Sequence, residues 1–490
     1  GSGRPCGRKG SPCRGLLWYS GLSSGRQNPM DARASLKRNT LLAAVMSSFL
    51  GPFTASSVTV ALPRIGTHFS MDAISLSWVA TAYLLSAAAF LVPVGRASDI
   101  YGRKKIFLWG MVFINLSSLL AGFSTSGTEL IVWRVVQGVG SSMIFGTGVT
   151  IVASVYPSNE RGKALGIVLT AVYVGVSSGP FIGGVLTDLL GWRSLFFTNV
   201  AIGTVVVVTT LWKIKEEWVE AEGESFDVVG SVLYVVAFTA AMYGLTALPS
   251  LKGISFFSGG LLGLFLFGLW ELKVEHPVLE LRLFMNNRVF LFSNLAALIN
   301  YSATFAVTFL ISLYLQYIKR LSPQAAGLVL VSQPLMQAVL STFTGRLSDR
   351  VEPRVVSSMG MVSLMIALLL FGFLGEATHT WLVVLNLLFL GFGFALFVSP
   401  NTNAIMSSVD KKFYGVASGT MATMRVIGQT LSMGIVMFVF MLFMGRIQIT
   451  EQYYGQFLQS TKTTFFIFSL LSFLGIFASL ARGRIHKKDG

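Results

Sequence analysis

The chain has 490 residues, of which 53% are hydrophobic and only 12% are charged. Soluble domains carry about 25% charged residues, so this composition excludes a molecule covered by water over most of its surface. The net charge is +16, but the basic residues lie in short clusters between long apolar runs. That placement is typical of membrane proteins. We therefore expect a lipid bilayer around this chain and no nucleic-acid partner.

The two cysteines, Cys6 and Cys13, both precede Met30. The rest of the chain therefore offers no disulfide framework, no cysteine-based metal site and no thiol nucleophile. Residues 1–29 are rich in Gly, Ser and Arg and lack the apolar core of a cleaved signal peptide. We expect residues 1–38 to be a disordered cytoplasmic leader, with Met30 as the true start.

Long apolar stretches dominate the remaining sequence. A membrane helix needs about 20 mostly apolar residues, because each residue rises 1.5 Å and the hydrocarbon layer is about 30 Å thick. Fourteen stretches meet this requirement, and the connections between them are short and polar. They cover residues 39–62, 76–95, 106–124, 128–155, 164–188, 193–213, 227–247, 254–271, 289–317, 323–344, 355–375, 380–407, 414–444 and 463–482.

Basic residues alternate between the two sides of the predicted bundle. From Met30 onward, the termini and the even-numbered connections carry 23 Lys and Arg residues, whereas the odd-numbered connections carry 7. The side richer in Lys and Arg faces the cytoplasm. This asymmetry predicts an even number of spans in the plasma membrane, with both termini cytoplasmic.

Two short sequences recur at matching places. GRASD at 95–99 returns as GRLSD at 345–349, each after the second span of its half, and RGKALG at 161–166 has a partner in GVASG at 415–419. The repeat predicts two six-helix halves, 39–214 and 289–482, around an inserted helix pair with cytoplasmic linkers at 215–288, followed by a cytoplasmic tail at 483–490. Repeated halves around a central site are a transporter architecture.

The segment GRASDIYGRKK at 95–105 resembles the signature loop of the major facilitator superfamily. An ordinary positive-inside loop is the alternative. The resemblance implies that Asp99 lies against the positive N-terminal end of span 13 and that Arg103 and Lys104 form further ion pairs. The predicted gating-loop residues are Gly95, Arg96, Asp99, Gly102, Arg103 and Lys104, with Gly345, Arg346, Asp349 and Arg350 in the second half.

Span 4 contains an arginine inside the apolar run LIVWRVVQGVGSSM. An arginine within a membrane span is energetically expensive and therefore a candidate functional residue. This segment is similar to the family's second motif, which implies that Arg134 faces a cavity and takes part in proton coupling. The alternative is that Arg134 snorkels to the outer headgroups.

Span 5 contains GVSSGPFIGG at 175–184, similar to the motif that marks exporters within the family. Its Gly-Pro pair interrupts the helix, and its small residues permit close helix packing. A generic kink with a packing face is the alternative. The residues predicted for this antiporter motif are Gly175, Gly179, Pro180, Gly183 and Gly184.

Three further segments are similar to the fourteen-span drug:proton antiporter family: VTVALPRI at 58–65, WRSLFFTN at 192–199 and GVASGTMATMRVIGQ at 415–429. The resemblance covers almost all of residues 39–482. It implies an all-α integral membrane protein with the major facilitator fold, in which each six-helix half contains inverted 3+3 repeats and two helices are inserted between the halves. It also implies a monomeric multidrug efflux protein that exports lipophilic small molecules, with a proton as coupling ion.

One departure from the family concerns acidity. Many relatives have a carboxylate in span 1 before the ALP tripeptide, where this chain has Thr54, and no predicted span has Asp or Glu near its midplane. Arg134 cannot readily release a proton. We therefore expect neutral, zwitterionic or anionic substrates, with coupling through a peripheral carboxylate such as Asp99 or Asp188, or through the charge of the substrate.

Polar residues inside the apolar spans are candidates for the substrate cavity, although buried polar groups also join helices to one another. A second intramembrane arginine, Arg425, is included with Arg134 and Thr54 as a coupling or cavity residue. The cavity candidates are Tyr83, Gln137, Tyr173, Asn300, Tyr301, Gln333, Gln337, Asn401 and Gln429.

The sequence predicts no catalytic residue, metal site or cofactor. Its four histidines are scattered, and it lacks the G-x-x-x-x-G-K-[ST] loop of ATP-driven pumps. We therefore expect a secondary transporter and not an enzyme. Two alternatives remain: an exporter of one specific metabolite, lipid or amino acid, and a membrane sensor that keeps the fold without moving a solute.

Overall fold

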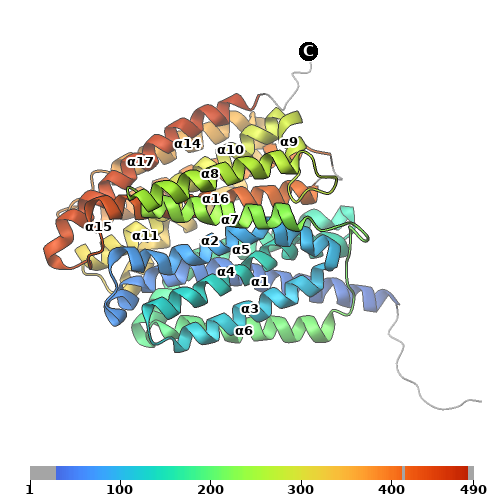
Figure 1. Ribbon diagram of the computed structural model, residues 1–490, viewed down its shortest axis with the longest axis horizontal. Helices are drawn as coiled ribbons and strands as arrows, with labels where there is room; N and C mark the ends of the chain where they lie inside the picture. Colours follow the sequence, from blue (N-terminus) through green and yellow to red (C-terminus); the bar gives the residue numbers. More distant parts are fainter. Residues whose placement is uncertain (1–28, 411–413, 484–490) are drawn as a thin grey trace, which may run out of the picture.

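The computed structural model describes the backbone of residues 29–410 and 414–483 and, within these ranges, every side chain except those of residues 29–34, 158, 159 and 349. This part of the chain is almost entirely helical (Figure 1). It contains 14 helices or helix pairs that are long and apolar enough to cross a membrane, which confirms the number predicted from the sequence.

The first half consists of six long helices. Side-chain caps set several of their starts: Asp72 accepts hydrogen bonds from the Ile74 and Ser75 amides at the start of the second helix, and Ser126 caps the fourth. The helices are α1 (Pro29–Phe69), α2 (Ala73–Tyr101), α3 (Arg103–Phe123), α4 (Gly127–Val155), α5 (Ser158–Leu189) and α6 (Arg193–Lys213).

Helix α1 corrects one prediction about the leader. It begins at Pro29, a residue type that favours the first turn of a helix, so residues 29–38 are helical and not disordered. This extension is fixed to α5, because the Lys37 ammonium lies 2.7 Å from the Glu160 carboxylate. The Tyr156 hydroxyl also donates to the Lys37 carbonyl. Residues 1–28 and 484–490 lie outside the described residues.

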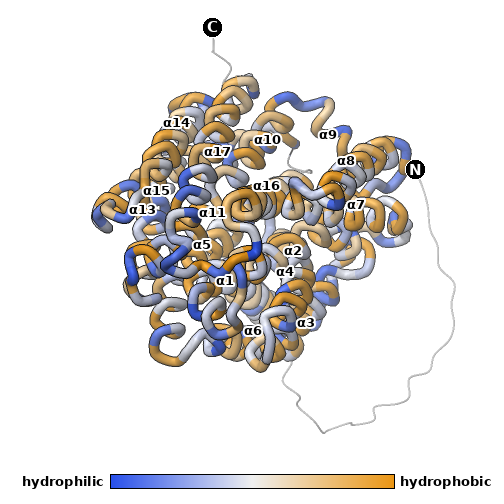
Figure 2. Tube along the Cα trace, turned by 60° about the vertical axis from the view of Figure 1, so that its left-hand side comes forward, coloured by the Kyte–Doolittle hydropathy of each residue, from blue (hydrophilic) through white to orange (hydrophobic). Residues whose placement is uncertain are grey.

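An inserted helix pair follows the first half. Helices α7 (Val228–Ala247) and α8 (Leu251–Glu271) pack closely against each other, and the short helix α9 (Leu281–Asn286) precedes the second half. Helix α7 also packs against α2 of the first half and α16 of the second. In Figure 1 the pair lies in front of the boundary between the two halves, and Figure 2 shows it at the edge of the bundle.

The second half has six spans, two of which are interrupted. The ninth span comprises two α-helices and a π-helical turn, and the tenth is two α-helices that meet at Val331. The elements are α10 (Arg288–Thr304), α11 (Ala306–Leu313), η1 (Tyr314–Ile318), α12 (Pro323–Leu330), α13 (Ser332–Arg350), α14 (Pro353–Phe371), α15 (Thr380–Ser407), α16 (Tyr414–Phe443), η3 (Glu451–Tyr453) and α17 (Tyr454–Ala481).

The outer surface of the bundle is apolar along the helices. Hydrophobic residues dominate the helical segments in Figure 2, and hydrophilic residues gather near the helix ends. Large apolar side chains such as Trp212, Leu251 and Phe373 are exposed. An exposed apolar surface of this extent is stable in lipid, whereas in water it would drive association.

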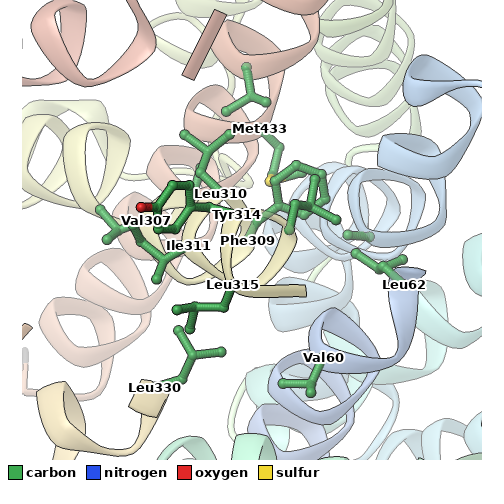
Figure 3. Packing of buried hydrophobic residues seen from close by; sticks show 14 of the residues in the cluster. Val60, Leu62, Val307, Phe309, Leu310, Ile311, Tyr314, Leu315, Leu330 and Met433 are labelled. Atoms are coloured by element: carbon green, nitrogen blue, oxygen red, sulfur yellow. The ribbon is translucent and has the colours of Figure 1, made fainter. Parts of the chain in front are cut away.

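The two halves meet at one end of the bundle, which we name the closed end and which carries the α1–α2 and α16–α17 connections. There the Ala73 amide donates to the Ile447 carbonyl at 3.0 Å, and Gln448 Nε2 donates to the Ser70 carbonyl at 2.7 Å. Farther in, Gln316 Nε2 donates to the Val60 carbonyl at 2.9 Å. Apolar residues of both halves, including Val60, Leu62, Leu310 and Met433, form one core cluster here (Figure 3).

The opposite end, which we name the open end, carries the loop at 95–105 and the termini of the bundle. A Cβ atom built on Gly95, Gly345, Gly415 or Gly419 would have no neighbouring atom within 4 Å. These glycines belong to motifs of both halves, so the halves do not pack through them in this structure. The bundle is therefore joined at its closed end and separated at these motifs.

We predict that Gly327→Val destabilises the closed end. A Cβ on Gly327 would overlap the Pro180 carbonyl oxygen and lie 2.9 Å from the Pro180 carbonyl carbon, both of which are backbone atoms that no rotamer change can move. Overpacking of this kind costs about 1–3 kcal/mol, so the detergent-purified protein should unfold at a temperature lower by several degrees.

The matched control is Gly259→Val, because Gly259 is a helical glycine whose Cβ would have no neighbour within 4 Å. Its thermal unfolding should stay close to that of the wild type. Equal shifts in the two variants would contradict the close packing of α5 and α12.

Candidate functional site

Arg134 lies in the interior of the first half. Its side chain is only 1% exposed, and Arg134 Nε donates to the Val79 carbonyl of α2 at 2.9 Å. A second nitrogen, Nη1, donates to the Gln137 amide oxygen one turn along α4. Gln137 Nε2 in turn donates to Ser118 Oγ of α3 at 2.7 Å. The buried charge is thus bound by neutral acceptors from α2 and α4, and Gln137 extends the network to α3.

Tyr83 completes this cluster. The Arg134 guanidinium carbon lies 4.4 Å from the centre of the Tyr83 ring, a cation–π distance. The Tyr83 hydroxyl lies 2.7 Å from Ser141 Oγ and 3.4 Å from the Gly51 carbonyl, so the cluster reaches α1. The structure brings together the predicted residues Arg134, Gln137 and Tyr83.

The surroundings of Arg134 differ from both sequence-based interpretations. The side chain does not snorkel to a headgroup region, because it is almost fully buried. It also does not face an open cavity, because its donors bind the backbone of α2 and a side chain of its own helix. Within the described residues, no carboxylate forms an ion pair with it. A neutral cage therefore retains a full positive charge inside the first half.

The signature loop is held by ion pairs at the open end. Arg103 is only 4% exposed, and its guanidinium binds Asp99 at 2.7 Å and Glu220 at 2.6 Å. Arg96 forms an ion pair with Glu224. Gly102, at the end of α2, has φ of 109°, a backbone conformation that glycine adopts without strain.

The partner of this loop is the acidic linker, residues 214–227, between α6 and α7. The Lys104 amide donates to Glu217 Oε1 at 2.7 Å, the Arg103 amide donates to the Trp218 carbonyl, and the Glu220 and Ala221 amides both donate to the Asp99 carbonyl. The predicted ion pairs of Arg103 therefore exist, but the acceptors are Asp99 and Glu220. In the described chain no hydrogen bond or ion pair joins Asp99 to α16, contrary to the expected contact with span 13.

The sequence contains a charge pattern that indicates the contact between the signature loop and the acidic linker. The acidic linker carries five glutamates within nine residues, 216–224, next in space to the most basic connection of the first half. A run of acidic residues between two spans is unusual on the side rich in Lys and Arg. Charge complementarity between the two connections would have identified Glu217, Glu220 and Glu224 as functional candidates.

The corresponding loop of the second half has a different environment. Arg346 and Arg350 are exposed, and a Cβ on Gly345 would have no neighbour within 4 Å. The Asp349 side chain lies outside the described residues. Among the described side chains, the exposed Arg346 and Arg350 thus differ from the buried Arg103 of the first loop.

The antiporter motif is a packing surface on α5. A Cβ on Gly175 would lie 2.5 Å from the Phe49 carbonyl oxygen, and one on Gly183 would lie 2.6 Å from Ser57 Cβ. The glycines at 175, 179 and 183 therefore form a face on which α1 approaches closely. On the other side of α5, a Cβ on Gly184 would lie 3.0 Å from Gln324 Cα of α12. The motif thus joins α5 both to its own half and to the second half.

The second intramembrane arginine has no such cage. Arg425 is half-buried and lies within α16. Within the described residues it forms no hydrogen bond or ion pair. Tyr173 of α5 and Tyr301 of α10 both lie within electrostatic range of it. Residues of both halves therefore gather around one uncompensated positive charge.

The remaining cavity candidates do not form one group. The Thr54 hydroxyl donates to the Leu50 carbonyl of its own helix at 2.7 Å, so it is satisfied locally. Asn300 is fully buried and both of its side-chain amide atoms lack a hydrogen-bond partner among the described residues, whereas Asn401 Nδ2 donates to the Ser293 carbonyl at 3.2 Å. Gln337 is buried, and Gln333 and Gln429 are half-buried. The described residues include no group of three or more His, Cys, Asp or Glu side chains that could hold a metal ion.

Two six-helix halves with a helix pair inserted between them, joined at one end and carrying polar groups where the halves face each other, define a secondary membrane transporter. The family model of the Major Facilitator Superfamily matches residues 44–433. The chain therefore belongs to the major facilitator superfamily.

Individual relatives agree with this family. The riboflavin transporter RibZ of Clostridioides difficile (strain 630) is 30% identical over 380 residues, which cover 77% of this chain and 82% of that protein. The multidrug resistance protein Stp of Mycobacterium tuberculosis (strain CDC 1551 / Oshkosh) is 30% identical over 402 residues, covering 81% and 74%. A bacterial homologue of the human lysosomal transporter Spinster has a similar fold, with a TM-score of 0.63 at 16% identity, covering 91% of this chain and 97% of that one.

We predict an energetic coupling between Arg134 and Gln137. Gln137→Leu removes an acceptor from a buried guanidinium, and Arg134→Met removes the charge itself. Because a hydrogen bond to a charged group contributes about 1.5–3 kcal/mol, the double variant should be more stable than the sum of the two single losses by a similar amount. Unfolding by SDS in mixed micelles measures the three free energies. Strict additivity would contradict the cage.

We also predict that the acidic linker is protected from proteolysis by its contacts with the signature loop. Glu217→Gln combined with Glu220→Gln should increase several-fold the rate at which trypsin cleaves after the exposed Lys213 or Lys215. Mass spectrometry of the fragments measures this rate. The control combines Glu216→Gln with Glu222→Gln, two exposed glutamates of the same linker, and should leave the rate unchanged. Equal rates for both double variants would show that charge alone, and not these contacts, matters.

Proposed function

We propose that this protein exports lipophilic small molecules from the cell, driven by proton influx. Support for the direction comes from the antiporter motif at 175–184 and from relatives named for multidrug resistance. The plasma membrane is the proposed location, with the open end and both termini on the cytoplasmic side. The 23 to 7 distribution of basic residues supports this orientation.

The observation that carries the proposal for the substrate is the environment of Arg425. Within the described residues this guanidinium has no acidic partner, and tyrosines of α5, in the first half, and α10, in the second, lie within its electrostatic range. A positive charge of this kind attracts an anionic or electron-rich group and repels a cation. Tyrosine rings add an apolar, aromatic surface with a polar tip. We therefore propose neutral, zwitterionic or anionic lipophiles as substrates, and not obligate cations.

Transport would proceed by alternating access between the closed and the open end. With the open end on the cytoplasmic side, as proposed, a structure whose halves are joined at the closed end would be the state that admits substrate from the cytoplasm. Closing the open end would bring the signature loop toward the start of α16, where Asp99 would meet the positive end of that helix. In that movement the acidic linker, which binds Arg103, would keep the loop in place.

A second candidate function is the transport of one specific compound. The relative RibZ is named for a single compound, riboflavin, and matches this chain over 82% of its own length. The polar residues on α10, α13 and α15 would then serve defined hydrogen bonds and not a permissive apolar surface. In either case we propose that the functional unit is a monomer, since all residues invoked here lie in one chain.

We predict that the full chain, reconstituted in proteoliposomes with an imposed pH gradient, dissipates this gradient when suitable lipophiles are added. The panel contains riboflavin and aromatic compounds matched in size but anionic, neutral or cationic. Anionic and neutral compounds should be active, and Arg134→Ala should abolish the signal by opening the cage in α4. Arg425→Gln should lower the apparent affinity for the anionic compounds by about 10-fold or more, because one hydrogen-bonded charge contributes about 1.5–3 kcal/mol.

The control is Arg446→Gln, which removes an exposed arginine at the closed end and should change nothing. Activity restricted to riboflavin would support the second candidate function. The proposed substrate class would be contradicted if the wild type transports quaternary ammonium compounds strongly and Arg425→Gln does not increase that transport. Movement of labelled compounds without any change in the gradient would contradict proton coupling.

A further inference from the structure

A buried carboxylate lies at the base of the inserted helix pair. Glu271, the last residue of α8, is only 3% exposed. Its Oε2 accepts a hydrogen bond from the Leu279 amide at 2.8 Å, in the chain segment that leads to α9. Its other oxygen, Oε1, is buried and has no hydrogen-bond partner in the described chain. One oxygen of this carboxylate is therefore satisfied and the other is not.

A second carboxylate, Asp227, lies beside it at the start of α7. Asp227 Oδ1 accepts from the Gly230 amide at 2.9 Å as a helix cap, and Oδ2 accepts from Trp270 Nε1 at 3.0 Å. A Cβ on Gly230 would lie 2.7 Å from Glu271 Oε1 and would also overlap Asp227 Oδ2. The unsatisfied oxygen of Glu271 therefore lies within about 5 Å of Asp227 Oδ2, inside the roughly 6 Å over which like charges disfavour each other.

No cation in the described chain neutralises this pair. The acidic groups that act on Glu271 are Asp227 and Glu280. Two basic groups of the adjoining connections are engaged elsewhere, since Arg96 and His276 both bind Glu224. The exposed Lys273 and Glu275 of the same connection form no ion pair in the structure. The buried Glu271 and the half-buried Asp227 thus lie close together without a cation that neutralises them in the described chain.

An ionised Glu271 would be costly here. An isolated buried charge costs several kcal/mol, and a neighbouring negative charge adds to this cost. A proton on Glu271 Oε1 removes the charge. It also converts the unsatisfied oxygen into a donor close to the acceptor Asp227 Oδ2. The geometry therefore calls for one proton on the pair.

We propose that Glu271 and Asp227 form a proton-binding site at the base of the inserted helix pair. Its location gives that proton a mechanical connection to both halves. Helix α7 packs against α2 and α16, and the Tyr234 hydroxyl of α7 donates to the Ala88 carbonyl of α2 at 3.3 Å. Loss of the proton would place a further negative charge beside the start of α7, the inserted helix that packs against both halves. A role of the site in coupling rests on the proposed function, whereas the presence of the proton does not.

Infrared spectroscopy of the full chain in lipid tests the site without any substrate, so failure of the export proposal would not affect the result. The wild type at neutral pH should show the carbonyl stretching band of a protonated carboxylic acid, and this band should shift in D2O. Glu271→Gln, which keeps the size and the acceptor for the Leu279 amide, should remove the band. Glu275→Gln, an exposed glutamate of the adjoining connection, should retain it.

The role of Asp227 is tested with Asp227→Asn, because asparagine preserves the helix cap while removing the negative charge. In this variant the Glu271 band should disappear at a lower pH than in the wild type. The proposal is overturned if the wild type shows no such band at neutral pH, or if Glu271→Gln leaves it unchanged. An Asp227→Asn variant that titrates like the wild type would overturn the sharing of the proton between the two residues.

Discussion

The lack of water in the hydrocarbon layer is the constraint on which the whole structure depends. Each backbone amide and carbonyl must be bound within its own segment, so the chain crosses as helices. Polar side chains face the same demand. Arg134 satisfies it by donating to a backbone carbonyl of α2 and to the side-chain oxygen of Gln137, and by lying over the ring of Tyr83. The cluster therefore ties α2, α3 and α4 together as a consequence of keeping one charge inside the first half.

Charge is handled differently where water is near. At the open end, Arg96 forms an ion pair with Glu224 and Arg103 with Glu220 of the acidic linker. Both glutamates are partly accessible to solvent. Arg425 lies between these extremes, since it is half-buried and forms no ion pair within the part of the chain that the structure describes. A caged charge, a paired charge and an uncompensated charge thus occur in three different places of the bundle. The uncompensated one is where a ligand gains most from binding.

The number and order of the spans followed directly from the sequence, because about 20 apolar residues are needed whatever the neighbours are. The family membership and the division into halves rested on short repeated motifs, and the family model confirmed the family. Local features that differ from continuous spans joined by short loops were not visible in the pattern of apolar residues. The break of the ninth span at Phe305, the helical residues 29–38 and the acidic linker all depend on contacts with distant parts of the chain.

The sequence by itself determined that this protein is a fourteen-span membrane transporter, since hydropathy and motifs are local properties. It also identified Arg134 and Arg425 as exceptional, because charge inside an apolar run is visible in one dimension. Only the tertiary structure decided which arginine is caged and which is free, and that Glu271, at the end of a span, is buried beside Asp227. The burial and the partners of a charge are set by residues far away in the chain, and these distances exist only after folding.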